Sequence, residues 1–157
     1  MKPRLATPAD IPELLRLAAL MYQSMGVDTE ASSWREGATK LLAERLGGDE
    51  LVMFAVDDPE REGRLVACGG AAVIQRVPGP ATPDGRWAYV QWMVTEPGFR
   101  RRGLARAVLE AILDWLSARG IVNVELHATK DGEPLYRSLG FGDPFSPELR
   151  RIGSRYR

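Results

Sequence analysis

The amino-acid sequence predicts an α/β (α+β) fold in which helices flank a mixed central sheet. Two observations lead to this expectation. Two β-type runs, residues 51–56 and 65–77, are separated by a short polar stretch, as in an antiparallel hairpin. Further along, a strand, an amphipathic helix and a second strand follow one another between Trp87 and Ala128. Such a crossover makes its two strands parallel and places a ligand at their carboxyl ends.

The chain is expected to begin with two helices. Residues 7–10 have the composition of a helix start, with a capping threonine and a proline in the first turn. Apolar residues then recur at helical spacing from Ile11 to Met25, and Gly26 is expected to end the helix. A second helix is expected from about Ser33 to the Gly47–Gly48 pair. Its apolar side would carry Trp34, Ala38, Leu41, Leu42 and Leu46.

Turn residues divide the rest of the chain into short elements, because glycine and proline interrupt regular structure. The expected elements are, in order, a loop at 78–85, a strand at 87–95, a helix from Leu104 to Gly120, a strand at 121–128, a short helix capped by Asp131 that ends before Gly140, a strand from Phe141 and a last strand at 148–152.

The strand expected at 121–128 has two chemically different faces. A parallel strand that is covered on both sides is normally apolar throughout, so this alternation indicates one open face. That face meets either bulk water or a polar ligand groove, and the sequence leaves both interpretations open. Along the strand Val122, Val124, Leu126 and Ala128 alternate with Asn123, Glu125, His127 and Thr129.

Length and composition narrow the functional class. A chain of 157 residues fits a single domain, here 1–157. The 21 basic and 21 acidic residues balance, which argues against a nucleic-acid partner. Cys68 is the only cysteine, so no disulfide framework or multi-cysteine metal site is expected. The start lacks the pattern of a secretory signal and no apolar run could cross a membrane. We therefore expect a cytoplasmic protein that has no membrane partner and binds no metal.

The strongest local signal is an arginine-rich turn between the strand 87–95 and the helix that follows it. The first amides of a helix have no intrahelical partner and lie at the positive end of its dipole, so they can hold phosphate oxygens. Small residues permit close approach, and arginines add charge-assisted contacts. A solvated basic turn would explain the same composition. The segment consists of Arg100, Arg101, Arg102, Gly103, Leu104, Ala105 and Arg106.

The arginine-rich turn and the segment that follows it resemble the motifs of a known family. The pattern Arg100-x-x-Gly103-x-Ala105 after a strand resembles the acetyl-CoA signature of the GNAT superfamily, the GCN5-related N-acetyltransferases. In that family a strand, a short helix and a Tyr-x-x-x-Gly-Phe stretch follow, and this chain has Tyr136, Gly140 and Phe141 at that spacing. The resemblance extends over nearly the whole chain, but the motifs that are specific to the family lie only within residues 87–141.

The resemblance implies a fold and a cosubstrate. The sheet would be mostly antiparallel, with two splayed central parallel strands and the pantetheine arm of acetyl-CoA between them. The backbone of Met93 and Val94, at a bulge, would bind the thioester, and the amides from Arg101 to Ala105 would hold the pyrophosphate. Tyr136 corresponds to the family's tyrosine near the sulfur, where a phenol can protonate the departing thiolate. A helix tyrosine that only packs against the sheet is the alternative.

Three residues are candidates for the role of the general base. Many relatives carry a carboxylate on the strand before the signature, but this chain has Gln91, which can only orient a water. Glu125 and His127 are the alternatives, although a lone histidine on a strand is more often structural. By this resemblance Thr129 is the candidate for a contact with the cosubstrate, at a position where relatives often carry an asparagine. Cys68 lies in a strand without a nearby histidine and fits a core position better than a nucleophile.

Two functions from different classes therefore remain. The first is an N-acetyltransferase that acts on a small-molecule or peptide amine, and the second is a module that senses acyl-CoA without catalysis. Four side chains of the first two helices could line an acceptor pocket or could simply be core: Met21, Tyr22, Met25 and Trp34. The sequence predicts no nucleic-acid partner and leaves monomer and homodimer open.

Overall fold

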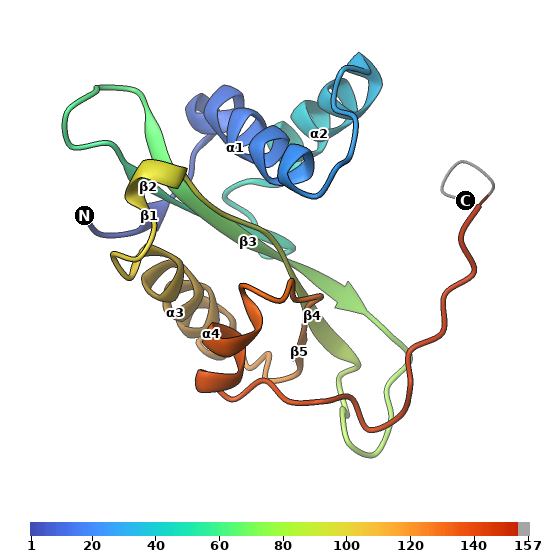
Figure 1. The fold of residues 1–157 in the computed structure, drawn as a ribbon. Coiled ribbons are helices and arrows are strands. Elements are labelled where there is room, and N and C mark those ends of the chain that lie inside the picture. The colour runs from blue at the N-terminus through green and yellow to red at the C-terminus, as the bar shows by residue number, and fades with distance from the viewer. Residues whose placement is uncertain (154–157) are drawn as a thin grey trace. The chain divides into compact units, whose positions relative to one another are not determined.

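The computed structural model describes residues 1–153 (Figure 1). The chain divides into two compact units, one of residues 1–126 and one that starts at His127. The first unit contains the sheet and three of the α-helices. The second contains one short helix. Among the described residues, no helix combines the length and the apolar character that a membrane crossing requires.

The sheet of the first unit has five strands in the order β1-β2-β3-β4-β5. Neighbouring strands are antiparallel except for β4 and β5, which are parallel. This confirms the predicted mixed, mostly antiparallel sheet with its hairpin and its crossover. The short β1, which pairs with β2, was not expected from the sequence. The strands are β1 Arg4–Leu5, β2 Leu51–Asp57, β3 Leu65–Gln75, β4 Arg86–Thr95 and β5 Val124–Glu125.

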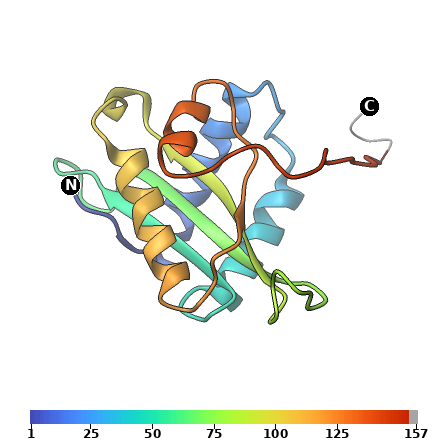
Figure 2. The same cartoon turned by 90° about the horizontal axis from the view of Figure 1, so that it is seen from below.

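Helices cover both faces of this sheet. The helices α1 (Ile11–Ser24) and α2 (Ser32–Arg45) lie on one side, and α3 (Leu104–Ser117) lies on the other, across β3 (Figures 1 and 2). The core under α1 contains Leu14, Leu17, Met53, Cys68 and Val94, and all five are buried. The core under α3 contains Val108, Leu109, Ile112 and Leu116, which have no exposed surface. The helices α1 and α3 therefore each present one apolar stripe to the sheet.

The start of α1 follows the predicted capping pattern. The 3-10 turn η1 (Pro8–Asp10) precedes α1, and the Asp10 carboxylate accepts a hydrogen bond from the Thr7 N–H at 2.7 Å. After α1, Gly26 has a φ of 77°, a left-handed value that glycine adopts without steric strain. Gly26 therefore ends the helix as expected.

The apolar side predicted for α2 is confirmed except at Leu41. Leu42 is buried, and Trp34, Ala38 and Leu46 are partly buried, whereas Leu41 is exposed. Leu41 points about 100° away from Leu42, and the contact strip of this helix is too narrow to cover both. The helix packs against α1 through this strip, which includes Trp34.

The strand expected at 121–128 is much shorter than predicted. Only Val124 and Glu125 pair with β4, and Val122 is 78% exposed. The alternation in the sequence therefore does not mark a buried apolar face along its full length. On β4 the pairing ends at Tyr89.

The second unit differs from the prediction at both ends of its helix. The helix α4 (Glu133–Ser138) is preceded by Thr129, whose Oγ1 accepts the Gly132 N–H at 3.2 Å, so Thr129 and not Asp131 binds the amide that precedes the helix. No strand forms between Phe141 and residue 153, so both strands expected there are wrong. Leu149 is 91% exposed, and an apolar residue that buries nothing gives a strand little to pack against.

Candidate active site

The site begins at an irregularity in the middle of β4. Cys68 of β3 lies opposite Val94, and Gly70 lies opposite Gln91, so Trp92 and Met93 together face one residue of β3. Trp92 also has a φ of 55°. This is a β-bulge, and it lies one residue earlier than the Met93–Val94 position expected from the sequence, because Val94 is back in register.

Side chains on both faces of the sheet hold this bulge. The Cys68 thiol donates to the Trp92 carbonyl at 3.5 Å. On the face covered by α3, a Cβ at position 69 would collide with the Met93 sulfur and lie 2.9 Å from Val108. Gly69 is therefore needed for Met93 to cross β3 and pack under α3. Trp92 points to the opposite face, where it packs against the core under α1.

The edge of β4 beside the bulge is open. β5 pairs with Ala88 and Tyr89 only, and no strand of the described residues pairs with the edge from Val90 to Thr95. Strands that part in this way leave backbone N–H and C=O groups able to bind an extended ligand. The splay predicted for the two parallel strands is thus present, although β5 is the last strand of the sheet.

The loop after β4 leads directly into α3. The 3-10 turn η2 (Pro97–Phe99) is followed by two left-handed residues, Arg101 with a φ of 63° and Gly103 with a φ of 79°. Gly103 is the residue before α3, and the first hydrogen bond of the helix runs from Ala107 N–H to Gly103 C=O at 3.0 Å. The N–H groups of residues 104–106 precede that bond and therefore have no acceptor within the helix.

The arginines of this loop differ in what they contact. Arg100 donates from Nε to the Thr95 carbonyl at 3.2 Å. The Arg102 guanidinium lies 5.0 Å from the centre of the Phe99 ring. Both side chains are exposed, as are Arg101 and Arg106, whereas Leu104 is buried and fixes the first turn of α3 on the sheet. The loop is thus basic at its surface and anchored at one apolar residue.

The three residues considered as the general base have different surroundings. Gln91 lies on β4 opposite Gly70, immediately before the bulge. Glu125 is opposite Tyr89, which by strand alternation puts it on the same face as Gln91, and it forms an ion pair with Arg76 at 2.6 Å. His127 belongs to the second unit, where its Nε2 lies 2.8 Å from the Glu148 carboxylate.

Tyr136 and Thr129 both lie in the second unit. Tyr136 is on α4, and its ring meets Phe141 edge to face with 6.0 Å between the ring centres. Burial raises the pKa of the Tyr136 phenol, so the hydroxyl stays protonated over the physiological range. It therefore has the protonation state that a general acid needs. The Thr129 hydroxyl accepts the Gly132 N–H just before α4.

The free thiol of Cys68 has no nucleophilic character. The residue is buried, and burial raises its pKa to about 12. A thiol with this pKa is protonated at neutral pH, and the thiolate is the reactive form. Cys68 is a core residue that also binds the bulge carbonyl, as the sequence favoured.

Sequence reasoning missed a cluster of four charged side chains at the end of β4. The Glu96 carboxylate accepts hydrogen bonds from Arg16 and, at 3.2 Å, from Arg64. Arg16 also donates to Glu13 at 2.8 Å, and Glu13 accepts the Leu65 N–H at 3.0 Å. The residues come from α1, the start of β3 and the end of β4. No sequence pattern could reveal them, since Arg16 and Glu96 are 80 positions apart.

An aromatic cluster joins the bulge to the first two helices. Its members are Tyr22 of α1, Trp34 of α2 and Trp92 of the bulge. The Tyr22 and Trp34 ring centres are 5.8 Å apart, and those of Trp34 and Trp92 are 6.5 Å apart, both edge to face. The Trp92 indole N–H donates to the Tyr22 hydroxyl at 3.1 Å. Two of these rings were candidates for an acceptor pocket, whereas Trp92 was not singled out.

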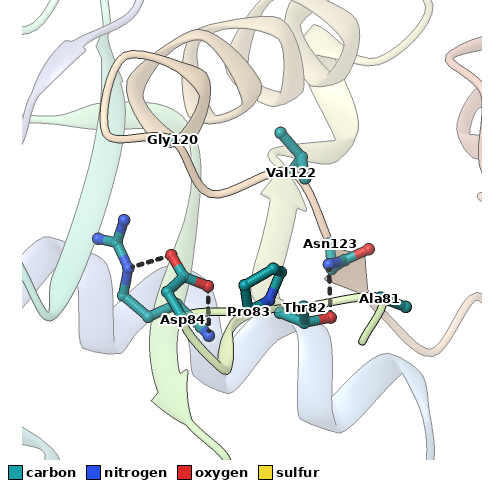
Figure 3. Close-up of a pocket in the computed structure, with 8 residues that line it drawn as sticks. Ala81, Thr82, Pro83, Asp84, Gly120, Val122 and Asn123 are labelled. Carbon is teal, nitrogen blue, oxygen red and sulfur yellow. Dashed lines mark hydrogen bonds and ion pairs between the residues drawn. The ribbon is translucent and has the colours of Figure 1, made fainter. Parts of the chain in front are cut away.

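A cavity of about 260 Å³ lies at the other end of β4 (Figure 3). It is formed by the 78–85 loop and the turn before β5. The polar side chains there satisfy one another: Asp84 pairs with Arg86, and Asn123 donates to Thr82 at 3.1 Å. The cavity is at the amino end of β4, whereas ligands of parallel strands bind at their carboxyl ends. We therefore place the candidate active site at the bulge and the α3 start.

Comparison with known proteins agrees with this geometry. The family model described as "Acetyltransferase (GNAT) family" matches residues 14–141, which is most of the chain. The chain belongs to the GNAT family. The match runs from α1 to Phe141 and so includes the bulge, the arginine-rich loop and the Tyr-x-x-x-Gly-Phe stretch. The predicted family is therefore confirmed.

Individual relatives agree with the family assignment. The chain is 38% identical over 66 residues to GCN5-related N-acetyltransferase 1, chloroplastic, from Arabidopsis thaliana, which is 41% of this chain and 34% of that protein. It is 39% identical over 54 residues to the [ribosomal protein bS18]-alanine N-acetyltransferase of Salmonella typhimurium, which is 32% of this chain and 36% of that protein. The matched segments thus span about a third of these relatives.

A solved structure covers more of the chain. The crystal structure of a predicted acetyltransferase from Clostridium acetobutylicum with acetyl-CoA has a TM-score of 0.85 and 24% identity, over 99% of this chain and 97% of that one. At this identity the likeness establishes the fold alone.

Proposed function

We propose that the protein is an N-acetyltransferase that moves the acetyl group of acetyl-CoA to the primary amine of a small molecule or peptide. The observation that carries the proposal is the continuous run of the open β4 edge, the bulge at Trp92 and Met93, and the left-handed Gly103 at the start of α3. Family membership supports it, as does the named activity of the Salmonella relative, which acts on a protein alanine. The family match crosses the boundary between the two units, so we propose that they act as one domain.

In this proposal the cosubstrate binds along the edge of β4 and ends at α3. The amides from Arg101 to Ala105 hold the pyrophosphate, since the first amides of α3 lack an intrahelical acceptor and carry the positive end of its dipole. The pantetheine lies along the open edge of β4 as an added strand. The N–H of Met93, at the bulge, then lies near the thioester carbonyl, where a fixed donor stabilises the developing oxyanion.

The transfer itself is a direct attack. The amine nitrogen forms a bond to the thioester carbon, the oxyanion collapses, and the C–S bond breaks to release coenzyme A as a thiolate. Tyr136 is the proposed general acid for that thiolate, and its raised pKa keeps the needed proton in place.

The amine must lose a proton before or during attack, because an alkylammonium has a pKa of about 10.4. Glu125 is ion-paired with Arg76, so its carboxylate already has a cationic partner. His127 is paired with Glu148 in the second unit. We therefore propose that a water oriented by Gln91 accepts the proton, with Glu125 and His127 as the residues to test against it.

The direct test measures thiol release from acetyl-CoA with a panel of primary amines, for wild type and for Tyr136→Phe. We expect release that requires an amine, and a kcat about 10²-fold lower in the variant. Phenylalanine keeps the ring contact with Phe141, so the variant removes the hydroxyl alone. Acetyl-CoA binding without release for any amine would instead favour an acyl-CoA sensor.

A further inference from the structure

We propose that two side chains, Tyr22 and Cys68, are positioning residues for the transfer step. Together they hold Trp92 and thereby fix the direction of the Met93 N–H, the proposed oxyanion donor. The inference rests on the proposed transfer reaction and adds two residues that do not touch the reacting atoms. We call the pair of Tyr22 and Cys68 the Trp92 clamp.

Trp92 has a backbone conformation that needs support from its surroundings. Its φ of 55° lies in the left-handed region, which is unfavourable for a residue with a bulky side chain. Trp92 and Met93 also share a single opposite residue, Gly69, so the regular pairing with β3 is interrupted here. The strand ladder therefore does not by itself fix the peptide group between Trp92 and Met93, and other contacts are needed.

The Cys68 thiol supplies the first of these contacts, to the backbone of Trp92. The thiol donates to the Trp92 carbonyl, with 3.5 Å between sulfur and oxygen. Because the thiol is buried and its pKa is raised to about 12, it keeps its proton at neutral pH and remains a donor. Cys68 thus holds the carbonyl end of the peptide group that contains the Met93 N–H.

This contact determines where the Met93 N–H points. In a trans peptide group the C=O and the N–H point in opposite directions. The Trp92 carbonyl points to Cys68 on β3, so the Met93 N–H points away from that strand. On the side away from β3, no strand of the described residues pairs with β4 between Val90 and Thr95. The donor is therefore directed to the open edge, where the thioester is proposed to lie.

The Tyr22 hydroxyl supplies the second contact, to the side chain of Trp92. It accepts the Trp92 indole N–H at 3.1 Å. Tyr22 is carried by α1, which is anchored in the core through the fully buried Leu14 and Leu17. A ring that is tied to a rigid element limits the rotation of the residue that carries it. Trp92 is thus held by its carbonyl from β3 and by its indole from α1.

A fixed donor acts on the transition state more than on binding. The thioester oxygen carries a small partial charge before attack and an oxyanion charge after it, so donor orientation affects kcat more than the affinity for acetyl-CoA. Removal of an oxyanion donor lowers kcat by about 10²–10³-fold. A donor that is kept but loses its fixed direction should cost about 10-fold.

The first arm of the experiment measures the steady-state kinetics of Tyr22→Phe and Cys68→Ala. We expect each variant to lower kcat about 10-fold, with a KM for acetyl-CoA within about twofold of wild type. Cys68→Ser keeps a donor and should give a kcat between those of Cys68→Ala and wild type. An unchanged kcat in either Tyr22→Phe or Cys68→Ala overturns the inference.

Val56→Ala is the control for loss of core packing. Val56 lies on β2, opposite Ala67, and has no exposed surface. Its truncation should lower Tm at least as much as Cys68→Ala but leave kcat within about twofold of wild type. A fall of kcat in Val56→Ala as large as that in Cys68→Ala would assign the effect to general destabilisation and overturn the inference.

An infrared arm separates the Trp92 clamp from the transfer reaction, because it needs bound acetyl-CoA but no amine. Acetyl-CoA with carbon-13 at the thioester carbonyl is bound to each protein, and the carbonyl stretching frequency is measured. A hydrogen bond from the Met93 N–H polarises the carbonyl and lowers this frequency relative to free acetyl-CoA. We expect the band to return toward the free position in Tyr22→Phe and Cys68→Ala and to stay in place in Val56→Ala.

The outcomes of this arm distinguish the two proposals. A band that responds to both clamp variants supports the inference even if no amine releases thiol, and in that case only the transfer reaction is wrong. A band at the same frequency in wild type and in the clamp variants overturns the inference even if amines do release thiol. Failure of acetyl-CoA to bind overturns both proposals.

Discussion

At the scale of single residues, backbone strain gathers at the proposed site. Among the described residues, Trp92 and Arg101 are the two non-glycine residues with a positive φ, and they flank the end of β4. Such conformations cost on the order of 1–3 kcal/mol each and persist where the surrounding structure enforces them. Here the Cys68 thiol and the Tyr22 hydroxyl hold Trp92. The site therefore coincides with the least relaxed backbone of the first unit.

Gly103 gives a direct test at this scale. Its φ of 79° is unfavourable for any residue with a Cβ, by about 1–2 kcal/mol, although a Cβ there would meet nothing within 4 Å. We expect Gly103→Ala to raise the KM for acetyl-CoA about 5- to 10-fold, because the loop relaxes away from the geometry that presents its amides. Gly47→Ala is the control, with a φ of 88° and equally open space after α2. If both variants lower Tm to a similar extent and both also raise the KM for acetyl-CoA, the prediction is contradicted.

At the scale of elements, the cluster of Glu13, Arg16, Arg64 and Glu96 joins α1, β3 and β4 just before the loop that enters α3. The Glu96 carbonyl also accepts the Phe99 N–H at 2.9 Å, so Glu96 orients η2 from both its side chain and its backbone. Its side chain is 16% exposed. Ion pairs of this burial matter more than surface pairs, since removal of one partner leaves the other poorly solvated.

We expect Glu96→Gln to raise the KM for acetyl-CoA about 3- to 10-fold while kcat changes less than about twofold, because the loop is displaced but the reacting groups are not. Asp10→Asn is the matched control: Asp10 is 12% exposed and pairs with Arg4 at 2.9 Å, away from this loop. Both variants should lower Tm. If the KM for acetyl-CoA also rises in Asp10→Asn, general destabilisation and not loop position is the cause.

The elements also show what sequence could predict. The hairpin, the crossover and the start of α3 were predicted because their signals are local: Gly26 ends α1, and Gly103 precedes α3. Three features were not predicted, because each depends on contacts between distant segments. They are the exact bulge residue, the short length of β5 and the cluster of Glu13, Arg16, Arg64 and Glu96. Asp131 was predicted to cap α4, but the N-cap residue is Gly132, whose N–H donates to the Thr129 hydroxyl, and only the backbone path decides this.

At the scale of the whole molecule, two groups of ion pairs tie the first unit together, an exposed one around Arg4 and a partly buried one around Arg16. Arg4 joins β1 to η1 through Asp10 and to β2 through Asp57. Arg16 joins α1 to the sheet through Glu13 and Glu96. The guanidinium of Arg4 lowers the pKa of both Asp10 and Asp57. Burial alone would raise the pKa of Glu13, but its hydrogen bonds from Arg16 and Leu65 lower it overall.

These shifts predict acid sensitivity. A carboxylate whose pKa is lower in the folded than in the unfolded chain stabilises the fold above its unfolded pKa, near pH ~4, and the stabilisation is lost as pH falls below it. Urea unfolding should therefore give a nearly constant free energy of unfolding from about pH 7 to about pH 5 and a falling one below. In the double variant Arg4→Met and Arg16→Met, stability at about pH 7 should be lower and the fall with acid shallower, because the carboxylates no longer have depressed pKa values. Parallel pH profiles for the two proteins would show that these pairs do not control the acid stability of the fold.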